Sequence, residues 1–540
     1  MSNGGVELIG KTFQQEILER LSDLGQLYIV GGAVRDAQLG IPSKDVDAVT
    51  SLPLEEIEKR LLDWGYVPHT IGAHLQTVSL FKGTERLDIA PFSGEVEKDA
   101  LRRDFTLNAI YQDVHTGKII DPLGGLQDLY EKRLKACGRA EERFSEDPIR
   151  ILRLVRLAVR YGFVIDQETW QVAVDHISWL HKVSTERVTQ ELARILVLED
   201  VDKALGLLDD LGYWQDYIPE LARLKGLVQN RYHTKDAWEH TRHVVRNSPD
   251  RLLLRLAALF HDIGKWETAS RECYICGIMR LTHRGYQVEE YKLLNSKKNF
   301  DQWRNMHVEI HGGRLDNRPD TIVVKRIRLA QFTQEKPLKM VPEGKRHFLQ
   351  HEKASARLVK EILPRFQWSM VLPGGNKGER ELEYLVGHHM LGNLTFTNDL
   401  KGGLAHSRVV NKTRRFAWEV GWNGKAYNSQ RVEDLLDLWR ADFLGGKQVA
   451  EETIERFVWI QGEIRRECVF LDERDKRLSW VYFSEFAHKK DLEGERYGWF
   501  KEQVRRQVML NPNCRLEDLG FLEREYNFFL KNSCESSLTK

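Results

Sequence analysis

Apolar and polar positions alternate near the start of the chain in a way that predicts a sheet with helices packed on it. Between residues 27 and 121, short β-rich runs occur at LYIV, VDAVT, QTVSLF, RLDIAPF and AIYQDV, and helical patterns such as PLEEIEKRLLDWG separate them. Short strands that alternate with amphipathic helices are typical of a layered α/β structure. We therefore expect one domain with a mixed sheet in this part of the chain.

After DPLGG the apolar spacing changes to that of long amphipathic helices. The first, SEDPIRILRLVRLAVRYGF, is expected to begin with Ser145 as its cap, and to hold Glu146 and Asp147 in its first turn ahead of Pro148. Residues 266–345 interrupt the helical pattern with turns and the β-like run DTIVVKRIRLAQF. A structureless loop of that length would be unusual, so we expect an inserted subdomain.

These patterns predict an α+β multidomain protein. With 540 residues, 41% of them hydrophobic, the chain can build several cores. The aromatic residues of the last 90 positions are expected mainly to face a core rather than RNA. The expected parts are a head domain at 1–142, a helical neck at 143–230, a helical domain at 231–450 that carries the insertion 266–345, and a helical tail at 451–540.

Composition narrows the class of protein further. The formal net charge is only +1, from 81 Lys+Arg against 80 Asp+Glu, so a polyanionic partner must meet a local basic patch. No apolar run is long enough to span a bilayer, and the start of the chain lacks the pattern of an export signal. We expect a cytoplasmic protein without membrane contact, whose six cysteines are reduced.

Three aspartates carry the first candidate chemistry. Asp45 and Asp47 are two positions apart in a predicted strand, so both side chains leave the same face, and Asp88 lies in a later strand. Neighbouring carboxylates repel one another, and a divalent metal ion is the simplest means of neutralising them. Three carboxylates can complete a two-metal site for displacement at a phosphate. Gly31 and Gly32, between a strand and a helix, leave backbone N–H groups open to phosphate.

Five segments between residues 30 and 163 occur in a recognisable order: VGGAVRD, KDVDAVT, LRRDFTLNAI, DPLGGLQDL and RFSEDPIRILRLVRLAVRYGF. Together they resemble the class II tRNA nucleotidyltransferases and bacterial poly(A) polymerases, which have a polymerase-beta-like nucleotidyltransferase head and an all-α neck. The resemblance implies an enzyme that extends the tRNA 3′ end from CTP and ATP without a nucleic-acid template. It also implies that Asp45 and Asp47 bind two Mg²⁺ ions.

The same resemblance implies roles for further residues. Gly31, Gly32 and Arg35 would hold the triphosphate, and Arg103, Asp104 and Asn108 would contact the sugar and order the site. Asp147 and Arg150, expected on one helix face, would hydrogen-bond the Watson-Crick edge of the base. Arg153 and Arg156 continue that helix as a basic spiral, which suits phosphate contact or plain solvation.

The connection between Asp88 and Arg103 is only fifteen positions long. Many relatives that add CCA have a longer loop there, and enzymes that add only the two C residues resemble the short form. Addition of C alone and addition of C followed by A both remain open. Homopolymer synthesis by a poly(A) polymerase is the alternative within this class.

A second constellation lies downstream, where HDIGK follows an apolar helix. His240, His261, Asp262 and Asp442 resemble the metal-binding pattern of the HD phosphohydrolase superfamily, and His351, His388 and His389 are placed to serve a second metal. The expected chemistry is hydrolysis of phosphomonoesters or 2′,3′-cyclic phosphates by a metal-activated water. Lys265 could hold a phosphate oxygen. An alternative of a different class is an HD hydrolase attached to an inactive RNA-binding head.

The insertion contains a candidate zinc site. Cys273 and Cys276 have ligand spacing, and His307 and His311 follow with a second plausible spacing. Together they could bind Zn²⁺, although the gap between the pairs is longer than in a zinc finger. The alternative is two small buried thiols and two surface histidines. The number of subunits is not determined by these patterns.

Overall fold

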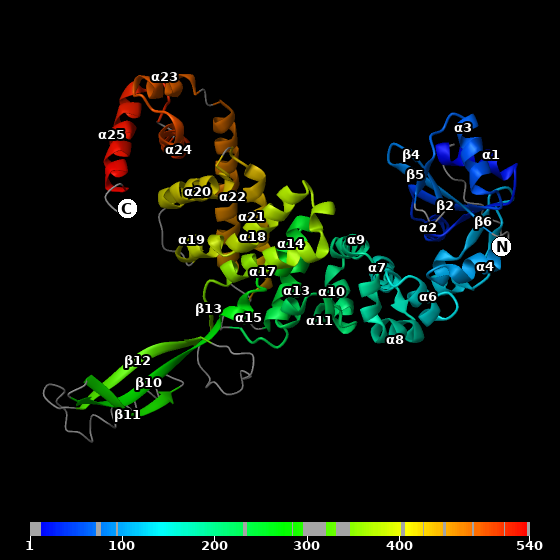
Figure 1. Ribbon diagram of the computed structural model, residues 1–540, viewed down its shortest axis with the longest axis horizontal. Coiled ribbons are helices and arrows are strands. Elements are labelled where there is room, and N and C mark those ends of the chain that lie inside the picture. The colour runs from blue at the N-terminus through cyan, green and yellow to red at the C-terminus, as the bar shows by residue number, and fades with distance from the viewer. Residues whose placement is uncertain are drawn as a thin grey trace. The chain divides into compact units, whose positions relative to one another are not determined.

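The computed structural model describes residues 12–536 apart from 72–76, 93–94, 230–234, 283–284, 295–319, 331–345, 401–405, 425, 447–449, 478–479 and 512–513. The chain, coloured from blue to red in Figure 1, divides into two compact units. The first comprises residues up to 222 together with 362–371, and the second comprises residues 223–361 together with 372–540. The predicted division into four domains is finer than this and stays a prediction.

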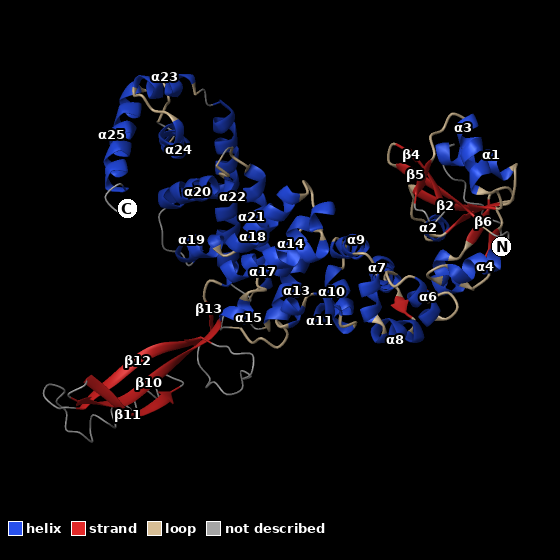
Figure 2. Ribbon diagram, in the orientation of Figure 1, coloured by secondary structure: helices blue, strands red, loops and turns tan. Residues whose placement is uncertain are grey.

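The first unit opens with a seven-stranded mixed sheet, whose strands are drawn in red in Figure 2. The strand order is β3-β4-β5-β2-β1-β6-β7, and only β2 and β5 pair in parallel within it. The strands are β1 (Leu27–Val30), β2 (Asp45–Thr50), β3 (His69–Ile71), β4 (Thr77–Lys82), β5 (Glu85–Pro91), β6 (Tyr111–Asp113) and β7 (Ile119–Ile120). The predicted strands are therefore confirmed.

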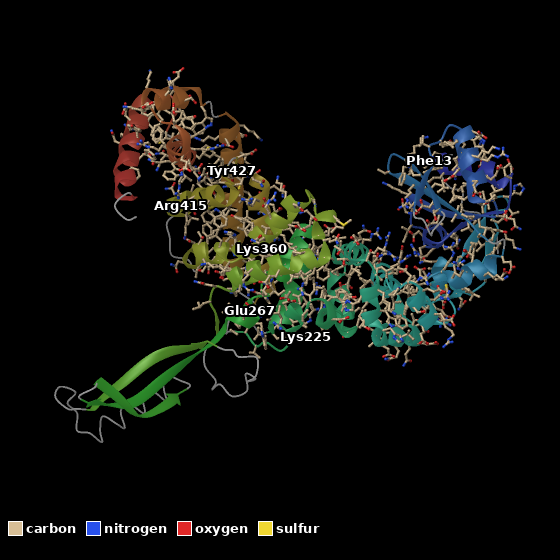
Figure 3. All side chains as sticks on the ribbon, viewed as in Figure 1. Phe13, Lys225, Glu267, Lys360, Arg415 and Tyr427 are labelled. Carbon is tan, nitrogen blue, oxygen red and sulfur yellow. The ribbon has the colours of Figure 1, made fainter. Side chains whose placement is uncertain are left out.

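Helices cover both faces of this sheet. On one face, α1 (Phe13–Ser22) and α3 (Leu54–Asp63) bury apolar side chains such as Phe13, labelled in Figure 3, against Ala48 of β2 and Ile89 of β5. On the other face, α4 (Val96–Arg102) packs with Val49 of β2. Because side chains alternate along a strand, Asp45 and Asp47 share the α4 face with Val49.

The rest of the first unit is mostly helical. The helix predicted to start near Ser145 is split in two, and this prediction was wrong. Asp147 ends α6 in an extended conformation, because the following Pro148 disfavours the helical region for the residue before it. The elements are α2 (Gly32–Gln38), η1 (Thr106–Asn108), α5 (Gly125–Tyr130), β8 (Arg133–Leu134), α6 (Ala140–Glu146), α7 (Arg150–Tyr161), β9 (Val164–Ile165), α8 (Gln167–Asp175), η2 (Ile177–Lys182), α9 (Thr185–Leu196), α10 (Val201–Asp210), α11 (Tyr213–Tyr217), α12 (Pro219–Ala222) and η4 (Trp368–Met370).

The second unit is a helical assembly with one sheet inserted in it. Central strand β10 pairs with β11, β12 and β13, all antiparallel, which confirms the β character predicted for residues 320–332 over β12. The sheet elements are β10 (Ala269–Thr282), β11 (Gly285–Leu294), β12 (Asp320–Ala330) and β13 (Arg346–Phe348). The helices are α13 (Ala237–Asn247), α14 (Leu252–Phe260), α15 (Lys265–Thr268), α17 (His351–Phe366, which ends in the first unit), α18 (Asn376–His388), α19 (Leu391–Leu400), α20 (His406–Gly421), α21 (Ser429–Gly445), α22 (Glu451–Arg477), α23 (Val481–Lys489), α24 (Gly494–Leu510) and α25 (Leu519–Ser536).

The last helices form a core of their own. Phe483, Phe486 and Phe500 are buried there, so the prediction that the aromatic residues of the tail mainly face a core is confirmed for these three. Across the described ranges, no helix combines the length and the apolar character that crossing a bilayer requires. Cys137, Cys468 and Cys514 are free thiols. The predicted α+β class is confirmed.

Candidate functional site

The three predicted aspartates lie on two neighbouring strands of the first sheet. The parallel pairing of β2 with β5 places Asp47 directly opposite Asp88 and Asp45 directly opposite Arg86. Asp45 and Asp47 are exposed. Asp88 is partly buried, accepts a hydrogen bond from Ser79 Oγ at 2.6 Å, and forms an ion pair with Arg86. The register therefore brings together carboxylates that are 41 positions apart in the sequence.

The surroundings of Asp47 suit a divalent cation. The protein partly screens this carboxylate from water and Asp88 adds its negative charge, and both effects raise the pKa of Asp47, although Arg103 opposes them. A nearby cation would stabilise the ionised form of a carboxylate whose pKa is raised by a second carboxylate. Gly31 adopts a φ of +77°, and a Cβ there would lie 3.5 Å from Asp47 Oδ2. The positive φ favours glycine at this turn, which lies next to the carboxylate.

The contacts of Arg35 differ from those of a triphosphate ligand, which is the role predicted for it. Its side chain is buried, and its guanidinium donates to Asp36 Oδ1, Asn108 Oδ1 and the Tyr161 hydroxyl. Because these protein groups occupy all three guanidinium nitrogens, the geometry does not favour triphosphate binding by Arg35. Gly32 packs beside it, since a Cβ on Gly32 would lie 3.5 Å from Arg35 Nη2. The network instead joins α2 to η1 and α7.

Arg103, Asp104 and Asn108 lie next to this network. Asp104 is buried, accepts a hydrogen bond from Asn108 Nδ2 at 2.9 Å and pairs with Arg153 Nη2 at 2.7 Å. Burial opposes ionisation of Asp104, but Arg153 and the Asn108 hydrogen bond outweigh it and lower the pKa. Arg103 pairs with Asp99 at 2.9 Å and remains partly exposed. Asn108 is thus hydrogen-bonded to both Asp104 and Arg35 inside the protein, and the roles predicted for Asp104 and Asn108 in ordering the site and contacting the sugar stay predictions.

Asp147 and Arg150 are not neighbours on one helix face, which corrects the prediction. Asp147 ends α6 and Arg150 begins α7. Arg150 donates to the backbone carbonyls of Arg143 (2.9 Å) and Arg102 (2.7 Å), and only 14% of its side chain is exposed.

Two further arginine ion pairs involve residues of α9. Arg187, which the sequence patterns did not single out, pairs with Asp147 Oδ2 at 2.7 Å. Arg156, a predicted nucleotide ligand, pairs instead with buried Glu191. Arg156 therefore contributes to helix packing.

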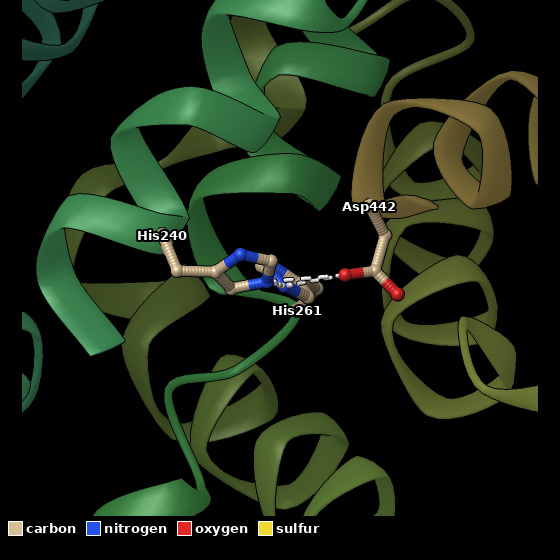
Figure 4. A group of neighbouring side chains, drawn as sticks. All are labelled: His240, His261 and Asp442. Carbon is tan, nitrogen blue, oxygen red and sulfur yellow. Dashed lines mark hydrogen bonds and ion pairs between the residues drawn. The ribbon is translucent and has the colours of Figure 1, made fainter. Parts of the chain in front are cut away.

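The second unit brings the HD residues together in two groups. His240, His261 and Asp442 form the first group, shown in Figure 4, and Asp262, His351 and His389 form the second. All six residues are buried. Asp262 faces both groups, because its Oδ2 lies 3.1 Å from His261 Nε2 and its Oδ1 lies 3.1 Å from His351 Nε2. Asp262 therefore lies between the two groups, with one carboxylate oxygen directed toward each.

The histidine rings are oriented for metal binding through one nitrogen. In each ring Nδ1 lies near a backbone carbonyl, which can only accept, so the tautomer with its proton on Nδ1 donates to that carbonyl and leaves a lone pair on Nε2. The four ring and carbonyl pairs are His240 with Gly445, His261 with Ala258, His351 with Phe348, and His389 with Val386.

Those lone pairs face one another across short distances. His351 Nε2 and His389 Nε2 are 3.1 Å apart, and His240 Nε2 and His261 Nε2 are 3.3 Å apart. Burial and the neighbouring histidines lower the pKa of His389 to about 3, so its ring is neutral at pH 7. A cation between such rings would relieve the repulsion of their lone pairs. The residues of the site therefore fit a pair of metal ions.

His388 does not belong to this site, and its prediction is corrected to His389. The His388 ring stacks on Tyr384 at 4.0 Å and its Nδ1 bonds to the Tyr384 carbonyl. Consecutive residues at the end of a helix point in directions about 100° apart, so only one of them can face the cluster.

Three residues outside the ligand groups form hydrogen bonds at the second site: Lys265, Gln229 and Asn393. Buried Lys265 places Nζ between Asp262 Oδ2 and Gln229 Oε1. Asn393 Nδ2 lies 3.4 Å from Asp442 Oδ2. Neither Gln229 nor Asn393 belongs to a motif, so the sequence contained no signal for them.

The candidate zinc ligands cannot be placed with respect to one another. Cys273 and Cys276 belong to β10, where they pair in register with Ile327 and Val324 of β12. Their side chains, and His307 and His311 altogether, lie outside the described residues.

Two family models match the first unit. Residues 27–135 match the poly A polymerase head domain, and residues 162–225 match a probable RNA and SrmB-binding site of polymerase A. A multifunctional CCA protein of Herminiimonas arsenicoxydans is 34% identical over 294 residues, which cover 50% of this chain and 68% of the relative. A CC-adding tRNA nucleotidyltransferase of Thermus thermophilus is 37% identical over 250 residues, which cover 44% of this chain and 56% of that one.

The chain spans 63% of the length of two multifunctional CCA proteins of Neisseria gonorrhoeae, which is less than two thirds. Among solved structures, the Bacillus stearothermophilus CCA-adding enzyme in complex with CTP aligns with a TM-score of 0.55 at 18% identity, and the alignment covers 96% of this chain and 98% of that one. This likeness shows a shared fold. The motif order, the paired aspartates and the sequence relatives together place the chain in the class II tRNA nucleotidyltransferase family of CCA-adding enzymes.

Proposed function

We propose that the protein adds C residues to the 3′ end of tRNA from CTP, without a nucleic-acid template, in the cytoplasm. The observation that carries the proposal is the parallel register of β2 and β5, which sets Asp45, Asp47 and Asp88 on adjacent strands, with Gly31 next to Asp47. Family membership supports the same reaction.

Asp45 and Asp47, with Asp88 beside them, would hold Mg²⁺. When bound, the cations neutralise the phosphates and activate the attacking hydroxyl. The oxygen of the tRNA 3′ hydroxyl forms a bond to the α-phosphorus of the nucleotide, and pyrophosphate leaves. The protein contributes mainly position and charge: Arg86 pairs with Asp88 along β5, and the buried Asp104 with Arg153 joins α7 to the segment before η1.

The short connection after Asp88 favours an enzyme that stops after the second C. Between β5 and Arg103 the chain forms α4 over Val96–Arg102, which leaves only residues 92–95 as a connector. One sequence relative is a CC-adding enzyme. Addition of a terminal A from ATP is the alternative on the same site, and a poly(A) polymerase is the second alternative.

A second activity, metal-dependent phosphohydrolysis, is favoured by the six buried ligands of the second unit. Their donor set is four imidazole nitrogens and two carboxylates. Imidazole suits transition metals such as Zn²⁺, Fe²⁺ or Ni²⁺ better than Mg²⁺. A bound metal would supply a hydroxide for attack on a phosphate ester, and Lys265 lies within reach to hold a phosphate oxygen. Zinc bound in the insertion remains a prediction from the spacing of its cysteines and histidines.

One experiment tests the extension reaction and the point at which it stops. The purified protein is incubated with Mg²⁺ and tRNAs that end before CCA, after C and after CC, with CTP, ATP or both. We expect extension to stop at CC. A long A ladder on arbitrary RNA would show a poly(A) polymerase, and a complete CCA end would show that the short connection does not prevent A addition.

Matched variants separate the two sites. Asp47→Ala should reduce extension by a factor of about 10³ or more, because one metal ligand is lost. It should leave phosphatase activity on a generic phosphomonoester unchanged, whereas His261→Ala should do the reverse. If either substitution abolishes both activities, the proposal of two independent sites is wrong. An inactive head with a working phosphatase would support the HD hydrolase alternative.

A further inference from the structure

The carboxylate of Asp442 has one oxygen inside the first ligand group and one outside it (Figure 4). Asp442 Oδ1 lies 3.1 Å from His240 Nε2 and 3.8 Å from His261 Nε2. Its other oxygen, Oδ2, lies 3.4 Å from the side-chain nitrogen of Asn393. The two oxygens therefore have different surroundings, because histidine nitrogens that can bind a metal face Oδ1 and an amide group faces Oδ2.

The orientation of the Asn393 amide is fixed from its other side by Trp439. Trp439 Nε1 donates a hydrogen bond of 2.8 Å to Asn393 Oδ1. The indole nitrogen can only donate, so the amide oxygen must face Trp439 and the amide nitrogen is left to face Asp442. That nitrogen only donates, and an ionised carboxylate only accepts. The hydrogen bonds from Trp439 through Asn393 to Asp442 therefore run in one direction.

The packing of two helices brings these three side chains together. Trp439 and Asp442 are three residues apart on α21, so they are neighbours on one face of that helix, and Asn393 lies in the first turn of α19. The Trp439 side chain is buried against α19, and a Cβ on Gly392 would overlap its indole ring. Glycine at position 392 thus allows the close approach that places Asn393 beside both residues of α21.

We propose that Asn393 is a positioning residue for the metal ion of the first ligand group, which holds Asp442 so that only Oδ1 is available to the cation. This inference rests on the metal-dependent activity proposed for the second unit. A carboxylate that binds through both oxygens occupies two coordination positions of a metal ion. One that is held by an amide occupies a single position, which leaves another open to water or substrate, as a catalytic metal requires.

The test measures the binding of Co²⁺ to the full-length protein, by competition with a chromophoric chelator and by the visible absorption of the bound ion. Asn393→Leu, which nearly keeps the shape of the side chain but cannot donate, should raise the dissociation constant of the first-group ion by about 10–100-fold. The absorption of that ion should also change, because the freed carboxylate can bind through both oxygens. The binding step that is weakened in His240→Gln identifies the first-group ion.

Two controls separate a positioning role from a general disturbance of α19. Asn398→Leu is the matched variant, because Asn398 is exposed on the same helix, and it should bind Co²⁺ as the unsubstituted protein does. The second ligand group is the internal control. Its ligand His389 lies four residues before Asn393, so a local distortion of this segment would weaken the second-group ion as well. Asn393→Leu should leave the affinity for that ion unchanged.

An unchanged affinity for the first-group ion in Asn393→Leu would overturn the inference. Equal weakening of both ions would overturn it too, because loss of helix packing alone predicts that result. An unsubstituted protein that binds no Co²⁺ would contradict both the inference and the proposed second activity. If the unsubstituted protein binds Co²⁺ but hydrolyses no phosphomonoester, the proposed phosphohydrolysis is wrong, whereas a selective loss in Asn393→Leu would still support the role of Asn393.

Discussion

At the scale of single residues, two adjacent histidines at the end of α18 have opposite surroundings. His389 is buried with its Nε2 3.1 Å from that of His351, whereas His388 is partly buried and stacks on Tyr384. The two residues have the same chemistry and almost the same backbone position. If substitution of His389 changes metal binding and substitution of His388 does not, the cause is therefore the position of the ring at the metal site rather than the stability of the helix.

We predict that His389→Gln lowers the metal content of the second unit by about one ion per chain, since one of the two ligand groups loses a nitrogen. His388→Gln should retain the full content. The measurement is elemental analysis after loading with a transition metal and desalting. Equal metal content in both variants would contradict the assignment of His389.

At the scale of secondary-structure elements, α7 holds the head sheet through its ends. Arg153 near its start pairs with Asp104, and Tyr161 at its end accepts from Arg35 and donates to Asp36 at 2.9 Å. Tyr161 also lies under the Arg35 guanidinium, 4.5 Å from ring centroid to Cζ. Helix α2, which follows the Gly31 turn, is thereby fixed to α7.

We predict that Tyr161→Phe lowers the opening free energy of α2 by about 1–3 kcal/mol, because hydrogen bonds to a charged pair are lost while the ring remains. Hydrogen exchange followed peptide by peptide would show faster exchange in α2 and at the end of α7. Tyr130→Phe is the control, because Tyr130 is 85% exposed. Identical exchange in the two variants would contradict a bracing role for the Tyr161 hydroxyl.

The elements differ in how far the sequence predicted them. Strands such as LYIV and VDAVT were predicted because their period and composition are local properties. The break between α6 and α7 was not predicted, because Ser145 resembles a helix cap. The effect of Pro148 on the backbone of Asp147 is the stronger of the two and ends α6 at Glu146. The sequence predicted that Asp88 would join Asp45 and Asp47 at one site, but it did not predict the strand register that places Asp47 opposite Asp88. The contact between Asp147 and Arg187 depends on how α9 packs on α7, which no local pattern encodes.

At the scale of the whole molecule, the first unit is not a contiguous stretch of chain. Its contacts include residues 362–371, where Trp368 is fully buried and the Phe366 carbonyl accepts from Thr189 Oγ1. The predicted head boundary at residue 142 would also separate buried Asp104 from Arg153. Removal of one partner of a buried ion pair leaves an uncompensated charge, which is costly.

We predict that a fragment ending at residue 142 does not fold cooperatively, whereas a fragment ending at 222 folds with a lower melting temperature than the first unit has in the full chain. Circular dichroism melts of the two fragments test this. Addition of a peptide with the sequence of residues 362–371 should raise the melting temperature of the longer fragment. Cooperative melting of the shorter fragment would show that the contacts to α7 are dispensable.

The parallel pairing of β2 and β5 also has a consequence for how the protein is made. Asp45 and Asp47 leave the ribosome before Asp88, and a parallel pair can close only after its crossover has been synthesised. The proposed Mg²⁺ site is therefore absent from the nascent head until β5 joins the sheet. Ions that bind only the completed sheet stabilise it by mass action. Cellular magnesium would thus favour the finished fold over its precursors, and incomplete chains would be unable to modify RNA.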